Sequence, residues 1–418
     1  METLPQDQSN GWTAELSFPE FPRLNQSSTA DVVVIGGGYT GVSACIELQR
    51  HYPHQRVILL DAHQPGRGAS ARNSGYLVDS TLNDGHLSDA GLQAYASKYA
   101  LARRALEHVQ DWVQAFAIPC QWNACGKFHA AHGHEQLAKL ERFSKVLDSL
   151  GLEHGYWDAT QLTPRLGTSY YRHAIWTAGA VMLQPAQLML GLLNQLRSVG
   201  IYGDSPVVAL RPNAKGVQVQ TPQGQIQAQR VLVCTNAGLR ELGHRRTFPL
   251  YLTASLTRVL DRLPEEYGVL SAQAMGATLR VTQDRRIMIR NTAEVGHCTP
   301  QTRQADHLRG LQRRFDWIKP EDIEHTWGGF TCISGNSANV FEQTHPRVWQ
   351  AGCYNGGGIG LGCLFGAELA RWAMGEASDA REQILARPRP NWLPPQPFLN
   401  AGVRIRLARD RRRAQAER

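Results

Sequence analysis

Three glycines and one aspartate form the pattern in this chain that points most directly to chemistry. Gly36, Gly38 and Gly41 follow a β-branched run and open a helical pattern, and Asp61 stands twenty residues after the last of them. The first glycine of such a pattern makes a tight turn, the second lets the backbone approach a pyrophosphate, and the third lets helix and strand pack closely. The helix N-terminus offers N–H groups to the phosphates, and the acid accepts hydrogen bonds from a ribose. The sequence therefore predicts a dinucleotide site, and the pattern alone leaves NAD and FAD open.

The elements around these residues have the pattern of a βαβ unit. The run 30–35 is β-branched and bounded by glycines, which is typical of a buried parallel strand. Residues 40–51 carry apolar side chains at helical spacing, and 56–61 is a second apolar run that ends on Asp61. We therefore expect strand, helix and strand in that order, with the glycines at the first turn.

The rest of the chain alternates helical and strand patterns, and it contains no internal repeat. Helical spacing predicts helices within 86–160 and over 185–199, 303–316 and the stretch from the glycine cluster at 356–362 to about 374. Short alternating runs over 207–228 predict an antiparallel meander that leads into a buried strand at 230–234. Further strands are expected at 278–281, 286–289 and 347–351, and the proline-rich stretch 387–397 is expected to end the fold.

Composition indicates a folded enzyme rather than a disordered or membrane-spanning chain. The 418 residues include 42% hydrophobic and 19% charged residues, and no run approaches the length of a membrane span. The eight cysteines show no pairing or zinc spacing and the N-terminus has no signal-peptide pattern, so we expect a cytoplasmic protein without a metal. Much of the net charge of +8 comes from arginines after residue 403. We expect that basic tail to be solvated, and the alternative is a role in binding RNA, acidic lipid or a partner.

Four further segments resemble one family. The segments Asp61-Ala62 and 66–75 are similar to the loop that follows the second strand in the D-amino-acid-oxidase superfamily, nearest to its γ-glutamylputrescine and pipecolate oxidase branch. The segments 231–238 and 351–362 resemble the strand and turn beside the adenosine and the signature in which a helix start faces the flavin pyrimidine. The resemblance covers roughly residues 8–385 and implies FAD rather than NAD.

The resemblance also implies a fold and a set of cofactor contacts. The fold is α/β, with a Rossmann-like FAD-binding domain of the glutathione-reductase type and a second, mixed-sheet (α+β) substrate domain. The expected parts are an arm at 1–29, a discontinuous FAD-binding domain at 30–90, 161–245 and 331–385, a substrate domain at 91–160 and 246–330, and the proline-rich segment and basic tail at 386–418. The residues expected to contact FAD are Gly36, Gly38, Tyr39, Thr40, Gly41, Asp61, Ala62, Gly68, Ala69, Ser70, Arg72, Asn73, Ser74, Gly75, Val207, Thr235, Asn236, Ala237, Gly357, Gly358, Ile359, Gly360 and Leu361.

The chain departs from the family at three places. One branch attaches its flavin through a cysteine, but Cys332 falls out of register with that position, which lies near Phe330, so the resemblance implies non-covalent FAD. The same branch places a lysine over the flavin, and the matching strand here offers Met288. Where the family commonly shows Thr-Pro-Asp, this chain has Ser334-Gly335-Asn336. An acceptor other than oxygen, such as a quinone or a protein, therefore stays open.

The implied reaction is oxidation of a C–N bond in a small amine or amino acid. Hydride passes from the α-carbon to flavin N5, the product is an imine, and reoxidation by oxygen gives hydrogen peroxide; no catalytic acid or base is obligatory, and none is assigned. Arg280 or Arg290 is expected to pair with a substrate carboxylate. Tyr76, Tyr251, Trp327 and Tyr354 are candidates for an aromatic wall. Two alternatives stay open: a flavoenzyme that acts on modified tRNA, and a flavin-binding subunit with reduced or no turnover.

Overall fold

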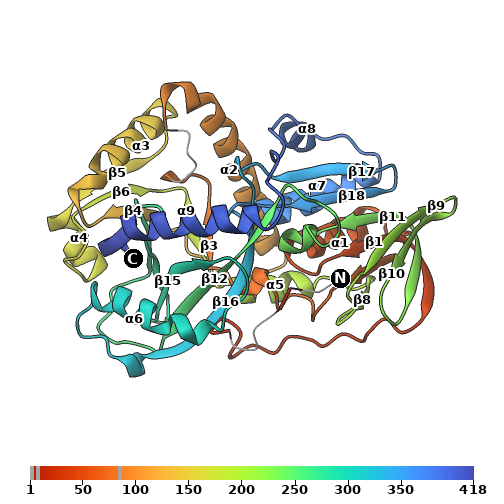
Figure 1. Ribbon diagram of the computed structural model, residues 1–418, viewed down its shortest axis with the longest axis horizontal. Coiled ribbons are helices and arrows are strands. Elements are labelled where there is room, and N and C mark those ends of the chain that lie inside the picture. Colours follow the sequence, from red (N-terminus) through yellow and green to blue (C-terminus); the bar gives the residue numbers. More distant parts are fainter. Residues whose placement is uncertain (1–3, 6–9, 83–86) are drawn as a thin grey trace.

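The chain folds around two eight-stranded sheets that lie side by side (Figure 1). This computed structural model describes residues 4–5, 10–82 and 87–418. Parts of the predicted arm, 1–3 and 6–9, and of the first FAD-binding segment, 83–86, lie outside the described residues. In the remainder of the arm, Trp12, Phe18 and Leu24 are buried against the domains.

The first sheet contains the predicted βαβ unit. Its order is β17-β18-β11-β1-β2-β8, and the hairpin of β9 and β10 continues from β11. Strands β18, β11, β1, β2 and β8 are parallel, whereas β17 is antiparallel to β18. The strands are β1 (Ser27–Ile35), β2 (Val57–Leu60), β8 (Gly200–Tyr202), β9 (Ala209–Asn213), β10 (Gly216–Gln220), β11 (Gln225–Val233), β17 (Val340–His345) and β18 (Val348–Gly352).

Alternation along β1 divides the core between the two faces of this sheet. Val32 and Val34 pack with helices α1 (Tyr39–His51), α5 (Pro185–Leu193) and α7 (Gly360–Ala373). Val33 and Ile35 point to the opposite face and pack with the β9–β10 hairpin. Because both faces are covered, the strand is apolar at successive positions, as the sequence predicts for a buried parallel strand.

The second sheet is largely antiparallel and forms the other half of the molecule. Its order is β16-β12-β15-β14-β13-β4-β6-β5, with one parallel pair, β13 and β4. The strands are β4 (Lys127–Ala131), β5 (His154–Asp158), β6 (His173–Thr177), β12 (Phe248–Thr257), β13 (Tyr267–Ser271), β14 (Thr278–Val281), β15 (Ile287–Glu294) and β16 (Ile323–Ile333). Helices α3 (Leu137–Ser149), α4 (Ala159–Leu166) and α6 (Gln304–Gln312) belong to this half. Helix α2 (Leu92–Ala115) packs mainly against α7 of the first half. A separate antiparallel pair joins β3 (Tyr76–Val78) to β7 (Ala180–Met182).

The C-terminal residues are folded, which corrects the expectation that the fold ends at the proline-rich stretch 387–397. Most arginines of this segment are exposed to solvent. Helix α8 (Asp379–Leu385) follows α7, and helix α9 (Phe398–Ala414) crosses the front of the molecule in Figure 1. Beyond α9, the Glu417 carboxylate accepts hydrogen bonds from the His132 N–H at 2.6 Å and from the Ser271 hydroxyl at 3.1 Å. The Ala277 N–H donates to the Glu417 carbonyl at 2.8 Å. The end of the chain is thus anchored in the second half of the molecule.

Three further expectations differ from the structure. The region 86–160 is not helical throughout, because β4 and β5 lie within it. Strand β6, placed by the prediction within the FAD-binding segment 161–245, pairs with β4 and β5 in the second sheet. The helix predicted over 185–199 ends earlier, with α5 at Leu193. None of the helices in the described ranges is long and apolar enough to cross a membrane.

Candidate functional site

The turn after β1 has the close contacts that its glycines were predicted to permit. Gly36 has a φ of +105°, a backbone conformation that residues other than glycine rarely adopt. A Cβ on Gly41 would lie 1.8 Å from the Gly36 carbonyl oxygen, and a Cβ on Gly38 would lie 2.7 Å from the Ser70 hydroxyl. Glycine is therefore required here for the chain to bring the start of α1 onto β1.

Asp61 directly follows β2, and its carboxylate binds the same turn. Its Oδ2 accepts a hydrogen bond from the Gly37 N–H at 2.6 Å, and its Oδ1 accepts one from the His63 N–H at 2.8 Å. Burial raises the pKa of this carboxyl group. Each carboxylate oxygen keeps a second lone pair, so Asp61 can accept ribose hydroxyls in the manner predicted.

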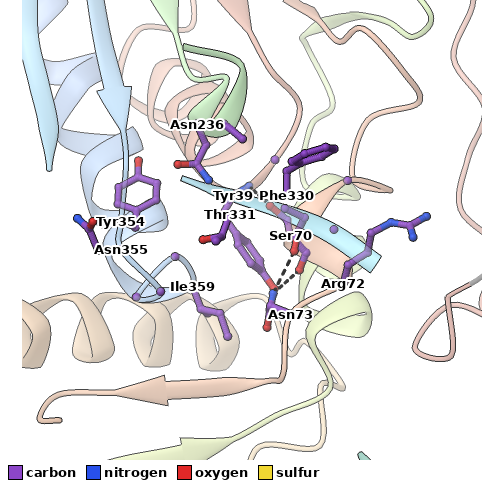
Figure 2. Close-up of a pocket in the computed structure, with 18 of the residues that line it drawn as sticks. Tyr39, Ser70, Arg72, Asn73, Asn236, Phe330, Thr331, Tyr354, Asn355 and Ile359 are labelled. Atoms are coloured by element: carbon purple, nitrogen blue, oxygen red, sulfur yellow. Dashed lines mark hydrogen bonds between the residues drawn. The ribbon is translucent and has the colours of Figure 1, made fainter. Parts of the chain in front are cut away.

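The loop that follows β2 is fixed against the start of α1. The Tyr39 N–H donates to the Ser70 hydroxyl at 2.9 Å, and Asn73 Nδ2 donates to the Ser70 carbonyl at 2.7 Å (Figure 2). Arg72 Nη1 donates to the Gly328 carbonyl at 3.2 Å, which ties this loop to β16. Trp12 in the arm donates from Nε1 to the Asn73 carbonyl at 2.8 Å. The loop is thus held between both halves of the molecule.

A third group of residues comes from the ends of β11 and β18 and the start of α7. Asn236 has a φ of +46° and accepts a hydrogen bond from the Cys353 N–H at 2.9 Å, which joins the two strand ends. Tyr354 Oη lies 2.7 Å from Thr40 Oγ1 and links this region to α1. Among the residues that the structure describes, no side chain caps the N-terminus of α7. That helix start therefore offers backbone N–H groups and the positive end of its dipole.

These segments surround one cavity of about 800 Å³ that extends between the two sheets. That volume falls in the range of cofactor and small-molecule sites. Figure 2 shows side chains from α1, the 69–73 loop, the end of β11, β16 and the 354–359 segment around it. Thr235 also lines the cavity, and its hydroxyl is buried without a hydrogen-bond partner in the described residues. A buried hydroxyl without a hydrogen-bond partner destabilises the fold unless a bound group forms a hydrogen bond with it. The cavity therefore fits a polar ligand such as a dinucleotide.

Most of the predicted cofactor contacts line this cavity. They are Gly36, Gly38, Tyr39, Thr40, Asp61, Ala62, Gly68, Ala69, Ser70, Arg72, Asn73, Ser74, Val207, Thr235, Asn236, Ala237, Gly357, Gly358, Ile359, Gly360 and Leu361. Gly41 and Gly75 are not among the lining residues. Gly41 packs on Gly36, and a Cβ on Gly75 would lie 2.2 Å from the Leu183 carbonyl, so both serve close packing behind the wall.

The six predicted substrate residues divide into two groups. Tyr76, Arg290, Trp327 and Tyr354 line the cavity, whereas Arg280 and Tyr251 do not. Arg280 is fully buried and forms an ion pair of 2.7 Å with Glu266, so its charge is already neutralised. The Tyr251 ring lies behind the wall, 4.9 Å from the ring of Phe330. Arg280 and Tyr251 therefore lie outside the cavity lining, in contrast to the expectation that they face the substrate.

Arg290 differs from Arg280 in its surroundings. Its guanidinium donates to Thr278 Oγ1 at 2.7 Å, and among the described residues no carboxylate pairs with it. Burial lowers its pKa. The side chain is half-buried in the cavity wall, and an anionic ligand in the cavity would pair with its guanidinium. Arg290 is therefore suited to bind an anionic ligand in this cavity.

The structure also places residues that the sequence did not single out. The cavity wall on the side of the second sheet is mainly apolar and comes from Leu250, Leu252, Leu270 and Met275, together with Lys98 of α2. Cys332 and Met288 are buried outside the lining. Asn336 is exposed and donates to the Arg389 carbonyl at 2.9 Å, away from the cavity. Alternating apolar residues in β12 were a signal for this wall, but the sequence does not indicate whether they face the cavity.

Comparisons with known proteins agree with this architecture. The family model described as FAD dependent oxidoreductase (DAO) matches residues 31–372. The chain is 26% identical over 378 residues to a probable oxidoreductase OrdL of Rhizobium meliloti, covering 86% of this chain and 87% of that protein. It is 26% identical over 375 residues to the gamma-glutamylputrescine oxidoreductase of Escherichia coli, with coverage of 86% and 87%. Among solved structures, a glycine oxidase from Geobacillus kaustophilus superposes with a TM-score of 0.74 at 18% identity, over 84% of this chain and 96% of that one.

The family match covers all the residues that line the cavity except Leu4, Pro5 and Arg387. The chain belongs to the DAO family of FAD-dependent oxidoreductases.

Proposed function

We propose that this chain oxidises a C–N bond in a small amine or amino acid that carries a carboxylate group. Support for the C–N chemistry comes from relatives and structural neighbours named gamma-glutamylputrescine oxidoreductase, glycine oxidase and L-proline dehydrogenase. Support for the carboxylate comes from Arg290. Arg290 carries the proposal because it is a half-buried guanidinium in the cavity wall. Its hydrogen-bond partner is a hydroxyl, and no carboxylate pairs with it in the described residues.

The proposed cofactor site is the part of the cavity formed by the first sheet. Asp61 would accept ribose hydroxyls, the start of α1 would face the pyrophosphate, and the start of α7 would face the flavin pyrimidine. We propose non-covalent attachment. Cys332 supports it because this side chain is buried outside the cavity lining, while Phe330 occupies the lining on the same strand.

Bound FAD would supply the acceptor for a hydride from the substrate α-carbon, which leaves an imine as the product. The side chains do the remaining work. Arg290 holds the carboxylate by paired N–H donors and so fixes the orientation of the α-carbon. Leu250, Leu252 and Leu270 exclude water from the reacting region. The N–H groups at the start of α7 stabilise negative charge that develops beside them.

Two measurements test this proposal. Acid precipitation of the purified protein should release FAD into the supernatant, and a flavin that stays with the pellet would contradict non-covalent binding. Anaerobic mixing with a panel of amino acids and amines should bleach the flavin absorbance for at least one carboxylate-bearing amine. Bleaching only by amines without a carboxylate would contradict the role of Arg290, and bleaching by no compound would favour a flavin-binding subunit without turnover. Peroxide formation in air then separates oxygen from other acceptors.

A further inference from the structure

The outer surface of helix α9 combines large apolar side chains with arginines. Phe398 is 70% exposed and Ile405 is 71% exposed, and Trp392 in the segment before the helix is 72% exposed. Few other large hydrophobic side chains of the described residues are as open to solvent. We call the exposed side of residues 389–413 the α9 face. The family model ends at residue 372, so this face lies outside the matched region.

Helical geometry places the apolar side chains of this face on one line. Phe398 and Ile405 are seven residues apart, which is about two turns, so they project in the same direction. Gly402 lies between them and is open, since a Cβ there would meet nothing within 4 Å. Arg409 and Arg412 continue the line toward the C-terminal end of the helix and are exposed. The α9 face is therefore apolar at its first turns and basic at its last.

The charge of the α9 face is almost entirely positive. Its exposed arginines are Arg389, Arg404, Arg406, Arg409, Arg412 and Arg413. The two acids of the segment 387–418 are both engaged: Asp410 pairs with Arg406 at 2.6 Å, and Glu417 is buried under the C-terminal end. The face thus presents arginines without exposed carboxylates of its own segment.

The opposite side of α9 is fixed to the protein. Leu399 and Leu407 are buried in a cluster with Phe248, Leu250 and Ala293. Arg411 forms an ion pair of 2.8 Å with Glu294 on β15. Because the inner side is packed and the end of the chain is anchored, the α9 face is held rigidly outward. It is a formed surface rather than a loose tail.

We propose that the α9 face docks the protein on an anionic lipid bilayer. A helix that lies in the bilayer interface combines Trp, Phe or aliphatic side chains with arginines, and its binding rises with buried apolar area and with anionic lipid. A second copy of the chain fits less well, because a two-fold contact through this face would place arginines against arginines. Nucleic acid would use the arginines and stack on Trp392 and Phe398, but it gives no role to Ile405.

Cosedimentation of the full-length flavoprotein with lipid vesicles tests the proposal. Binding is expected to vesicles of phosphatidylcholine mixed with phosphatidylglycerol, to be weak with phosphatidylcholine alone, and to fall as salt is raised. The double variant Phe398→Ser/Ile405→Ser should weaken binding at least about tenfold. Arg409→Ser/Arg412→Ser/Arg413→Ser should weaken it about 100-fold. Gly402→Glu, which touches no packed atom, should also weaken it by placing an acid among the arginines.

A matched charge control comes from exposed cations far from α9. Arg23→Ser/Arg211→Ser/Lys215→Ser removes the same charge from exposed residues of the first half of the molecule, and its vesicle binding should stay within about threefold of the parent. Flavin content should be unchanged in all these variants, and melting temperature should be unchanged in the serine variants, since the altered side chains are exposed. Equal losses in the control and the α9 variants would overturn the proposal, as would no binding to anionic vesicles.

Two further outcomes would also overturn the proposal. The first is binding to transfer RNA that is tighter than vesicle binding and is lost in the arginine variant but kept in Phe398→Ser/Ile405→Ser. The second is a dimer in sedimentation velocity that Ile405→Ser dissociates. None of these results depends on the substrate, so failure here leaves the proposed function standing.

Discussion

Arg290 on β15 lies directly opposite Thr278 on β14, and its guanidinium donates a hydrogen bond of 2.7 Å to the Thr278 hydroxyl inside the cavity. The register of two neighbouring strands thus fixes the direction of the one cation that we assign to the substrate. Arg280 pairs with Met288 on the same two strands, two residues further along, and is neutralised by Glu266. Two arginines on neighbouring strands of one sheet therefore have different surroundings.

Thr278 should position Arg290 for its ligand. Thr278→Val removes the hydroxyl while keeping the shape, and we expect the affinity for a carboxylate substrate to fall roughly fivefold, the equivalent of about 1 kcal/mol for one hydrogen bond. Thr278→Ser restores the hydroxyl and should restore affinity. Measurement of KM and kcat for all three proteins checks this, and an equal loss in the serine and valine variants would show that the hydroxyl is not the relevant group.

Arg280 should matter for stability rather than for substrate affinity. Arg280→Met leaves the buried Glu266 carboxylate without its partner, which is expected to cost about 3–5 kcal/mol of unfolding free energy. The double variant Arg280→Met/Glu266→Gln removes both charges and should recover much of the loss. Chemical denaturation of the three proteins provides the comparison. A selective rise in KM with unchanged stability would return Arg280 to the substrate face.

The glycine turn predicts a contrast between two alanine substitutions. Gly41→Ala would place a Cβ 1.8 Å from the Gly36 carbonyl, so the purified protein should contain little or no flavin. Gly402→Ala on the outer side of α9 meets nothing within 4 Å and should raise the unfolding free energy by about 0.5–1 kcal/mol, because alanine favours helix. The ratio of the flavin absorbance at about 450 nm to the protein absorbance at about 280 nm gives the flavin occupancy of each variant. Full flavin content in Gly41→Ala would be incompatible with the turn described here.

Thr235 should affect the loaded protein and the apoprotein differently. Its buried hydroxyl has no hydrogen-bond partner in the described residues, so Thr235→Val should leave the melting temperature of the apoprotein unchanged or slightly higher. In contrast, the Kd for FAD should rise roughly five- to tenfold if the cofactor forms a hydrogen bond with that hydroxyl. Titration of apoprotein with FAD gives the Kd. An unchanged Kd would remove Thr235 from the proposed cofactor contacts.

His307 predicts a loss of stability in acid. Burial lowers its pKa to about 4, and its Nδ1 lies 2.7 Å from the Ser255 hydroxyl. Between the unfolded pKa of about 6.5 and the folded value the unfolded chain binds a proton that the folded protein does not, so stability falls as pH falls through that window. His307→Gln should reduce the slope of unfolding free energy by about 1.4 kcal/mol per pH unit there. Equal slopes in both proteins would assign the acid sensitivity to other groups.

The sequence predicted the cofactor half well because its signals are local. The β-branched run before Gly36, the helical spacing after it and Asp61 all fall within one βαβ unit, where strand and helix contact each other directly. The second sheet was harder to predict. Strand β4 pairs with β6 and β13, which lie far along the chain. Because these partners are distant, its short apolar run was interpreted as part of the helical region 86–160.

The C-terminal helix and the two arginines show what local patterns leave out. Leu399, Val403 and Leu407 recur at four-residue spacing and were a signal for α9. The many arginines around them led to the interpretation of this segment as a solvated tail. Arg280 and Arg290 share one sheet face, and the sequence does not show that Glu266 will reach only the first of them. Pairing across distant segments decides which of them is available to a ligand.

The role of Arg290 in binding a substrate carboxylate is tested most directly by comparing an amino acid with its decarboxylated analogue. Anaerobic stopped-flow reduction of the flavin should be measured for an active amino acid and the matching amine, in the parent protein and in Arg290→Gln. We predict that Arg290→Gln raises the apparent Kd of the amino acid roughly 10- to 100-fold, the range for a hydrogen bond to a charged group, and leaves that of the amine unchanged. Equal effects of the substitution on both compounds, or no effect on the amino acid, would contradict the account.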